Sequence, residues 1–282
     1  MQFDEEELIQ AVIREVLAAL AGRSGDACLD CLGNCAAHCP NDVRTVVGAG
    51  ARRISYNGDG AAVPADLARY IDHTALKPET TPAQIDKLCQ EAVQFGFAAV
   101  CVNPAWIRRA ADNLRGTDVG IASVVGFPLG ANVAQIKAME ARRALRDGAN
   151  ELDMVINIGA LKSKDYDIVW DDIAKVADAS REVGAICKVI IEAALLTDEE
   201  KVIACRLAQD ARADYVKTST GFGPGGATVY DVALMREAVG PKMGIKAAGG
   251  IKTPEEARQM IAAGATRIGA SASVQIVEGA PA

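Results

Sequence analysis

Tyr215-Val-Lys-Thr-Ser-Thr-Gly221 is a short β-branched run with a single lysine, Lys217, and it opens into the glycine-rich loop Phe222-Gly-Pro-Gly-Gly226. A lysine among Val and Thr suits neither a solvent-facing strand nor a plain apolar core. Burial without a partner disfavours the ammonium form, so such a lysine becomes a neutral amine that attacks carbonyl groups. The alternative is a strand-end lysine with a covered stem and a head that reaches water. For a lone lysine this alternative is favoured.

Two further segments favour the reactive amine instead. Gly244-Ile-Lys-Ala-Ala-Gly-Gly250 is a second apolar strand with a central lysine, Lys246, and Glu151-Leu-Asp-Met-Val-Ile-Asn157 carries an inward-phase carboxylate, Asp153. Two neighbouring lysines repel each other as cations, which lowers the proton affinity of one of them, and a carboxylate relays protons. The three segments together predict a site built on Lys217.

Units of the same kind repeat along the chain from residue 64. Short apolar runs alternate with amphipathic helical patterns, which is typical of a parallel sheet covered by helices. Eight near-equal repeats favour closure into a (β/α)8, or TIM, barrel over an open doubly wound sheet. The predicted strands are 70–76, 98–103, 121–126, 151–157, 186–192, 215–220, 244–249 and 267–271, and the predicted helices are 65–69, 82–95, 131–147, 168–183, 197–211, 230–239 and 254–263.

The carboxyl ends of barrel strands face the active site, so polar residues inside otherwise apolar strands are the candidate site residues. For Thr74, Cys101 and Asn157, a place in a hydrogen-bonded core network is favoured over catalysis. The full set is Asp72, Thr74, Cys101, Asn103, Asp153, Asn157, Lys188, Glu192, Lys217, Thr218, Thr220, Lys246 and Ser271.

Six sequence motifs stand in an order that resembles the deoxyribose-phosphate aldolase family, the class I aldolases that form a Schiff base on a lysine. The resemblance covers about residues 64 to 280 and is specific because all six motifs occur together. They are Asp72-His-Thr74, Leu152-Asp-Met-Val-Ile-Asn157, Lys188-Val-Ile-Ile-Glu192, Lys217-Thr-Ser-Thr-Gly221, Lys246-Ala-Ala-Gly-Gly-Ile251 and Arg267-Ile-Gly-Ala-Ser271.

The resemblance implies a role for each matching residue. Lys217 matches the Schiff-base lysine, Lys246 the neighbour whose charge keeps it deprotonated, and Asp153 the aspartate that moves protons with a water. Asp72 and Lys188 match supporting positions. The implied reaction is the reversible cleavage of 2-deoxy-D-ribose 5-phosphate to acetaldehyde and D-glyceraldehyde 3-phosphate, without a metal or organic cofactor.

The resemblance also implies a phosphate pocket made by the loops after strands six, seven and eight, where backbone N–H groups suit a dianion. Two positions depart from the family pattern. Phe222 stands where many relatives have a lysine, and Ala272 where some have a second serine, so we expect backbone amides to hold the phosphate more than charge does. The matching residues are Gly221, Gly249, Gly250, Gly269 and Ser271.

The composition is that of a soluble globular protein with a large core. Hydrophobic residues make up 50% of the 282 residues and charged residues 24%, and the net charge is −7. An acidic chain with scattered basic residues argues against nucleic-acid binding. There is no apolar run long enough to cross a bilayer and no basic, apolar leader at the N-terminus. We expect a cytoplasmic homo-oligomer with no membrane partner.

Residues 1–22 form a predicted amphipathic helix, whose apolar stripe must be buried. One interpretation is docking on its own barrel or within an oligomer. The other is a targeting peptide of the kind that brings enzymes into bacterial microcompartments, with a shell protein binding residues 4–21. Membrane-surface binding is disfavoured because the polar face is acidic. The stripe is Leu8, Ile9, Val12, Ile13, Val16, Leu17 and Leu20.

Residues 23–62 combine a cysteine-rich linker with a helix–strand unit at 42–55, ahead of a barrel predicted for 63–282. Four of the eight cysteines cluster here, and as thiolates they are candidate ligands for zinc or an iron–sulfur cluster. The spacing fits no common pattern well, so a reduced loop is the alternative. The others, Cys89, Cys101, Cys187 and Cys205, read as buried thiols. The clustered cysteines are Cys28, Cys31, Cys35 and Cys39.

Two rival functions stay open at this stage. One is another Schiff-base aldolase or transaldolase that acts on a different sugar phosphate. The other is a non-catalytic assembly or redox-sensing protein, in which the extension is the functional part. The lysines and aspartate in the strands argue against the second rival, since an inert barrel has no reason to keep buried charges.

Overall fold

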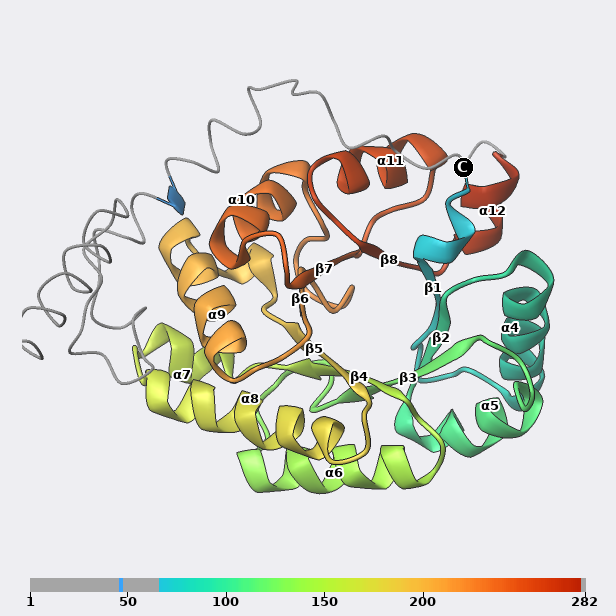
Figure 1. Cartoon of the computed structure of the whole chain (residues 1–282), viewed down its shortest axis with the longest axis horizontal. Coiled ribbons are helices and arrows are strands. Elements are labelled where there is room, and N and C mark those ends of the chain that lie inside the picture. The colour runs from blue at the N-terminus through green and yellow to red at the C-terminus, as the bar shows by residue number, and fades with distance from the viewer. Residues whose placement is uncertain (1–45, 48–65, 280–282) are drawn as a thin grey trace, which may run out of the picture.

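Eight parallel strands close into a barrel in chain order, so that β8 pairs with β1 (Figure 1). This computed structural model describes residues 46–47 and 66–279. The TIM barrel predicted from the repeats is confirmed. The strands are β1 (Ile71–Ala75), β2 (Ala99–Val102), β3 (Gly120–Val125), β4 (Glu151–Val155), β5 (Ile186–Ile190), β6 (Tyr215–Lys217), β7 (Gly244–Ala248) and β8 (Arg267–Ala270).

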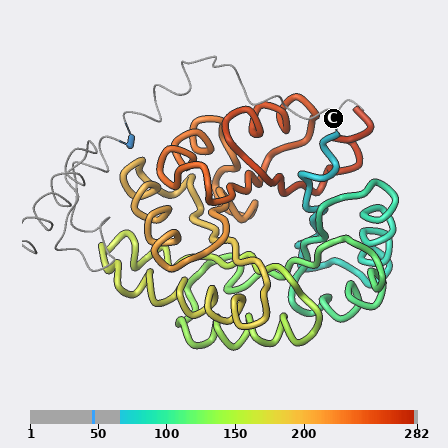
Figure 2. Tube along the Cα trace, in the orientation of Figure 1, coloured from blue at the N-terminus to red at the C-terminus, as the bar shows by residue number. Residues whose placement is uncertain are grey.

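Helices connect the strands and form an outer ring around the barrel (Figures 1 and 2). They are α4 (Pro82–Phe95), α5 (Ile107–Asn113), α6 (Ala134–Arg146), α7 (Ile158–Lys162), α8 (Tyr166–Arg181), α9 (Asp198–Asp210), α10 (Val229–Val239), α11 (Pro254–Ala262) and α12 (Ser273–Glu278). The sequence pattern does not predict α5, α7 and α12, because five to seven residues are too few to show an apolar period. The helix predicted at 65–69 is a 3-10 turn at Ala68–Tyr70.

Several strands end earlier at their carboxyl ends than the sequence predicts. β4 ends at Val155 because Asn157 caps α7, where its Oδ1 accepts a hydrogen bond from the Ala160 amide at 3.0 Å. β5 ends at Ile190 because Glu192 adopts the left-handed backbone conformation, with φ of 52°. At the carboxyl ends of β4 and β5, polar residues therefore lie outside the hydrogen bonding of the sheet and form part of the loops.

The strands are buried on both faces, as the near-continuous apolar runs predict. Outward-facing residues such as Ile71 and Val100 join the helices in the main hydrophobic core, which Val46 and Val47 also contact. A smaller apolar cluster of Leu76, Cys101, Ala122 and Val124 lies on the opposite face of the strands, inside the barrel. Cys89, Cys101, Cys187 and Cys205 are buried free thiols, as predicted.

The expectations for the N-terminal extension fall largely outside the described residues. They include the helix at residues 1–22 and the cluster Cys28, Cys31, Cys35 and Cys39, and these stay predictions. Of the helix expected within 42–55, the structure describes Val46 and Val47, which are helical. Within residues 46–47 and 66–279, no helix is both long enough and apolar enough to cross a membrane.

Candidate active site

Strand register brings the predicted catalytic residues together from distant parts of the chain. Lys217 on β6 and Lys246 on β7 are register partners, and Asp153 on β4 and Lys188 on β5 are partners in the same way. Side chains alternate between the two faces of a strand, so this register directs all four into the barrel. Asp153 and Lys246 are 93 positions apart in the sequence, and the barrel brings them into direct contact.

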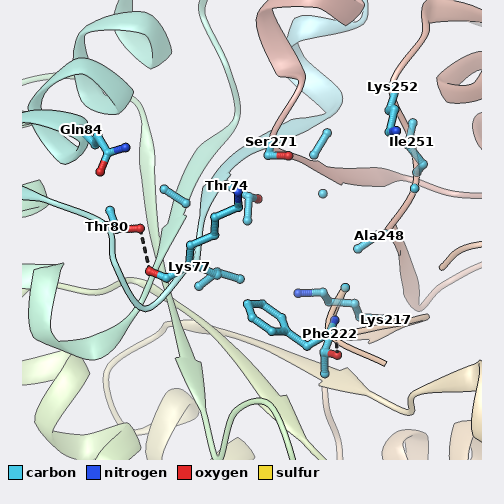
Figure 3. A pocket seen from close by; sticks show the side chains of 18 residues that line it. Thr74, Lys77, Thr80, Gln84, Lys217, Phe222, Ala248, Ile251, Lys252 and Ser271 are labelled. Atoms are coloured by element: carbon cyan, nitrogen blue, oxygen red, sulfur yellow. Dashed lines mark hydrogen bonds between the residues drawn. The ribbon is translucent and has the colours of Figure 1, made fainter. Parts of the chain in front are cut away.

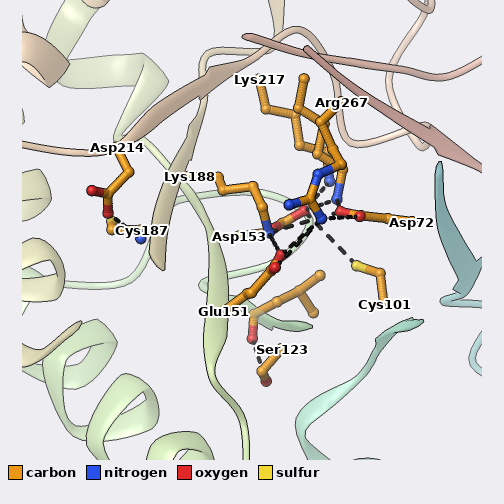
Figure 4. Close-up of polar contacts among 12 residues, drawn as sticks. Asp72, Cys101, Ser123, Glu151, Asp153, Cys187, Lys188, Asp214, Lys217 and Arg267 are labelled. Atoms are coloured by element: carbon orange, nitrogen blue, oxygen red, sulfur yellow. Dashed lines mark hydrogen bonds and ion pairs between the residues drawn. The ribbon is translucent and has the colours of Figure 1, made fainter. Parts of the chain in front are cut away.

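Asp153 is the centre of this group of side chains (Figure 4). It is fully buried, and its Oδ1 accepts a hydrogen bond from Lys188 Nζ at 2.7 Å. Its Oδ2 accepts from Lys217 Nζ and from Lys246 Nζ, each at 2.7 Å. The Sγ of Cys101 lies 3.8 Å from the same oxygen, so Cys101 contacts the site as well as the apolar cluster.

Asp72 on β1 extends the group and ties it to β8. Its Oδ2 accepts a hydrogen bond from Lys246, and its Oδ1 accepts from Arg267 Nη1 at 2.6 Å. Lys188 Nζ lies 3.8 Å from Asp72 Oδ2. The two supporting residues, Asp72 and Lys188, thus contact the same network as the predicted catalytic residues.

The sequence analysis missed two members of the network, Glu151 and Arg267. Lys188 Nζ pairs with Glu151 Oε2 at 2.6 Å, and Arg267 Nη1 lies 3.4 Å from both Glu151 oxygens. Glu151 precedes Asp153 by two positions, and Arg267 precedes Gly269 by two. Side chains two positions apart lie on the same face of a strand, so this spacing could have placed both residues on the inner face of the barrel. Together these seven side chains, Asp72, Glu151, Asp153, Lys188, Lys217, Lys246 and Arg267, are called the charge cluster below.

The charge cluster holds Asp72 and Asp153 ionised and two of its lysines protonated. Burial alone would raise the pKa of Asp153, but the surrounding lysines hold it well below its usual range. Burial alone would lower the pKa of Lys188 and Lys246, but Asp153 and the neighbouring carboxylates raise both above the ordinary value. Lys188 and Lys246 are therefore ammonium ions at neutral pH.

A cavity of about 370 Å³ opens beside Lys217 (Figure 3). Among the described members of the cluster, Lys217 alone lines it. Thr74 also lines the cavity, and its hydroxyl donates to the Asp72 carbonyl at 2.8 Å. All the residues predicted to bind phosphate lie in the lining, namely Gly221, Gly249, Gly250, Gly269 and Ser271.

The glycines of the lining allow loops to approach each other closely. Gly249 and Gly250 have φ of 91° and 82°, which disfavours other residues. A Cβ added to Gly226 would lie 2.2 Å from the carbonyl oxygen of Gly249. The loops after β6 and β7 therefore pack backbone against backbone, with N–H groups near the cavity.

Glu192 and Thr220 hold the loop after β6 in place. Thr220 donates its hydroxyl and its amide, the latter at 3.2 Å, to Glu192 Oε2. A Cβ on Gly223 would lie 2.8 Å from the Glu192 carboxyl carbon. These contacts make Glu192 a structural support of the loop.

Other polar candidates also have structural partners. Asn103 Nδ2 donates to the Leu76 carbonyl at 3.0 Å, and Thr218 exchanges two hydrogen bonds with the Ala248 backbone at 3.1 Å each. Asn157 caps α7. Nowhere in the described part of the chain do three or more His, Cys, Asp or Glu side chains gather as metal ligands would.

Fold and site define a (β/α)8 enzyme whose cavity opens onto a buried lysine. The DeoC/LacD family aldolase profile matches residues 67–279. The deoxyribose-phosphate aldolase of Thermococcus kodakarensis is 63% identical over 218 residues, which cover 77% of this chain and 97% of the relative. That of Macrococcus caseolyticus is 62% identical over 214 residues, 76% of this chain and 96% of the relative. The chain belongs to the DeoC/LacD family of aldolases.

A solved structure gives the same result for the fold. The tetrameric deoxyribose phosphate aldolase from Aeropyrum pernix superposes with a TM-score of 0.72 at 32% sequence identity. The match covers 83% of this chain and 96% of that chain.

Proposed function

We propose that this aldolase reversibly cleaves 2-deoxy-D-ribose 5-phosphate to acetaldehyde and D-glyceraldehyde 3-phosphate through a Schiff base on Lys217. The observation that carries the proposal is the placement of Lys217, which lines the cavity while its Nζ shares an oxygen of Asp153 with Lys246. Relatives about 60% identical over almost their whole length bear the name of this activity.

The pairing within the charge cluster sets Lys217 apart from the other basic residues. The charge cluster contains four basic side chains and three carboxylates. Lys217 donates to one carboxylate, whereas Lys246 is paired with both Asp72 and Asp153. Lys217 is therefore the basic residue of the cluster with the fewest carboxylate partners, which supports its assignment as the reacting amine.

The neutral Lys217 amine attacks the C1 aldehyde of the open-chain sugar, forming a C–N bond and a carbinolamine. Loss of water gives an iminium ion, which accepts the electron pair of the C2–C3 bond as that bond breaks. The C3 hydroxyl loses its proton and leaves as the aldehyde of glyceraldehyde 3-phosphate. Protonation of the enamine at C2 and hydrolysis then release acetaldehyde. We assign the transfer of these protons to Asp153, Lys246 and a water.

We assign phosphate binding to the loops after β6, β7 and β8. Gly221, Gly249, Gly250, Gly269 and Ser271 line the same cavity as Lys217. Amides at the two left-handed glycines are suited to bind an anion. The chemistry assigned to Lys217 needs no metal or organic cofactor.

Borohydride trapping tests this proposal. Reduction in the presence of 2-deoxy-D-ribose 5-phosphate should place a stable adduct on the peptide that contains Lys217. Lys217→Leu should abolish both adduct and turnover, while Lys162→Leu, which removes an exposed ion pair with Glu200, should keep both. An adduct on a different lysine, or full activity in Lys217→Leu, contradicts the assignment. A panel of sugar phosphates separates this activity from that of other Schiff-base aldolases and transaldolases.

We also propose that the chain is a homo-oligomer, since its Aeropyrum pernix relative is tetrameric. Light scattering on the full chain tests this. Targeting by residues 4–21 to a microcompartment within the cytoplasm, and metal binding by Cys28, Cys31, Cys35 and Cys39, rest on sequence alone. A reporter fused to residues 1–22 tests the first in cells with shell proteins. Zinc and iron analysis of anaerobically purified protein, with and without residues 1–45, tests the second.

A further inference from the structure

The loop between β1 and α4 forms a wall of the cavity that the assignments above do not use. Thr74, Leu76, Lys77, Thr80 and Gln84 all line the cavity from this side. Figure 3 shows the side chain of Lys77 extending across the cavity rather than away from it. A cationic side chain therefore faces the cavity from a loop other than the glycine-containing loops after β6, β7 and β8.

The lining of the cavity is positively charged. Lys77, Lys217 and Lys252 are the charged side chains among the described residues that line it, and no described carboxylate does. Lys217 is paired with Asp153, whereas Lys77 forms no ion pair with any other described residue. A cavity with unbalanced positive charge concentrates and binds anions.

The backbone that carries Lys77 is held in place. The Lys77 carbonyl accepts hydrogen bonds from the Thr80 hydroxyl at 2.7 Å and the Thr80 amide at 3.1 Å. The neighbouring Leu76 carbonyl accepts from Asn103 Nδ2 at 3.0 Å. Since the loop is anchored before the substrate binds, contact with an anion costs only the ordering of the Lys77 side chain.

The geometry points to Lys77 as a phosphate-binding residue of this enzyme, which supplies from the β1–α4 loop the cation that Phe222 does not supply from the loop after β6. Phe222 lines the same cavity and carries no charge. This inference rests on the proposed function, because it concerns the phosphate of the proposed substrate. It makes Lys77 a specificity residue that distinguishes phosphorylated from unphosphorylated sugars.

Steady-state kinetics of Lys77→Met on two substrates test the inference. With 2-deoxy-D-ribose 5-phosphate the KM should rise roughly tenfold, the effect of losing one charge-assisted hydrogen bond, while kcat stays unchanged. With unphosphorylated 2-deoxy-D-ribose neither constant should change. Lys77→Arg should keep most of the affinity. The matched control is Lys87→Met on α4, which removes an exposed lysine paired with Glu91 at 3.5 Å and should change nothing.

Two outcomes overturn the inference. A KM for the phosphorylated substrate that stays at the parent value removes Lys77 from the phosphate site. An equal rise in KM for both substrates would give Lys77 a general role in the loop. The variant Lys77→Gln checks that neither result is caused by the introduced methionine. Failure of the proposed function is distinguishable, because trapping of acetaldehyde on Lys217 involves no phosphate and is independent of Lys77.

Discussion

Lys217 and Lys246 lie opposite each other on β6 and β7, and both donate to the same oxygen, Oδ2 of Asp153, at 2.7 Å. This shared acceptor couples their protonation. Carboxylates raise the pKa of Lys246, which keeps it an ammonium ion, while Lys217 is the lysine of the pair that lines the cavity. A parallel sheet produces this arrangement when two strands each carry one inward lysine at the same level.

Removing Lys246 tests the coupling. Without it, the Asp153 oxygen that accepts from Lys217 has no second lysine beside it. Lys246→Leu should therefore lower kcat/KM by about 10²-fold or more at neutral pH. Stopped assays across pH measure this, with circular dichroism as the check on folding. A pH–rate profile that matches the parent would make Lys246 a structural residue.

Phe222 offers a gain-of-affinity test of the phosphate site. Its ring is half exposed at the cavity and packs edge-to-face on Phe127, with centroids 5.3 Å apart. Phe222→Lys adds a cation beside the glycine loops and should lower the KM for the phosphorylated sugar several-fold, up to roughly tenfold. Phe222→Leu removes the ring contact without adding charge and should not lower it. A KM that falls in both variants would show that the ring, not the missing charge, limits binding.

Lys137 on α6 and Asp172 on α8 form a buried ion pair outside the charge cluster, next to the carboxyl end of β4. Lys137 Nζ donates to Asp172 Oδ2 at 2.5 Å and to the Val155 carbonyl at 2.7 Å, and the same Asp172 oxygen accepts from the Asn157 amide. Lys137→Met leaves a buried carboxylate without its cation and should lower the free energy of unfolding by about 3–5 kcal/mol. Urea denaturation measures the change.

A double-mutant cycle supplies the control for this pair. Lys137→Met combined with Asp172→Leu removes both charges, and the double variant should be more stable than the two single losses added together. Additive losses would mean that the two side chains do not stabilise each other.

His73 predicts a dependence of stability on pH. Burial lowers the pKa of His73, which the hydrogen bond from its ring to Glu91, at 2.8 Å, only partly offsets. The unfolded chain therefore binds a proton near pH 6.5 that the folded chain does not, so stability falls as pH drops below that value. The other charge that acts on this ring is Lys87, which disfavours protonation.

The measurement is the urea midpoint at about pH 7.5 and about pH 5.5, on either side of the ordinary pKa of histidine. The parent should lose stability between the two, and His73→Gln, which keeps a polar partner for Glu91, should lose less. An identical loss in both proteins would assign the effect to other groups.

Much of the site could be predicted from the sequence, because buried parallel strands are mostly apolar and a polar residue within one is conspicuous. Lys217, Lys246 and Asp153 stand out in this way, and so do Asp72 and Lys188. Glu151 and Arg267 were not predicted as site residues although two predicted strands begin with them, because the first position of a strand lies far from the carboxyl end where active-site residues are expected.

The sequence alone determined the number and order of the strands, and hence the closed barrel and the inward direction of the lysines, because these depend on periods of two and 3.6 residues along the chain. Only the tertiary structure decided that Lys217 and Lys246 share one oxygen of Asp153 and that Lys77 faces the same cavity. The register between strands and the course of the loops set those contacts, and both depend on packing between segments far apart in the chain.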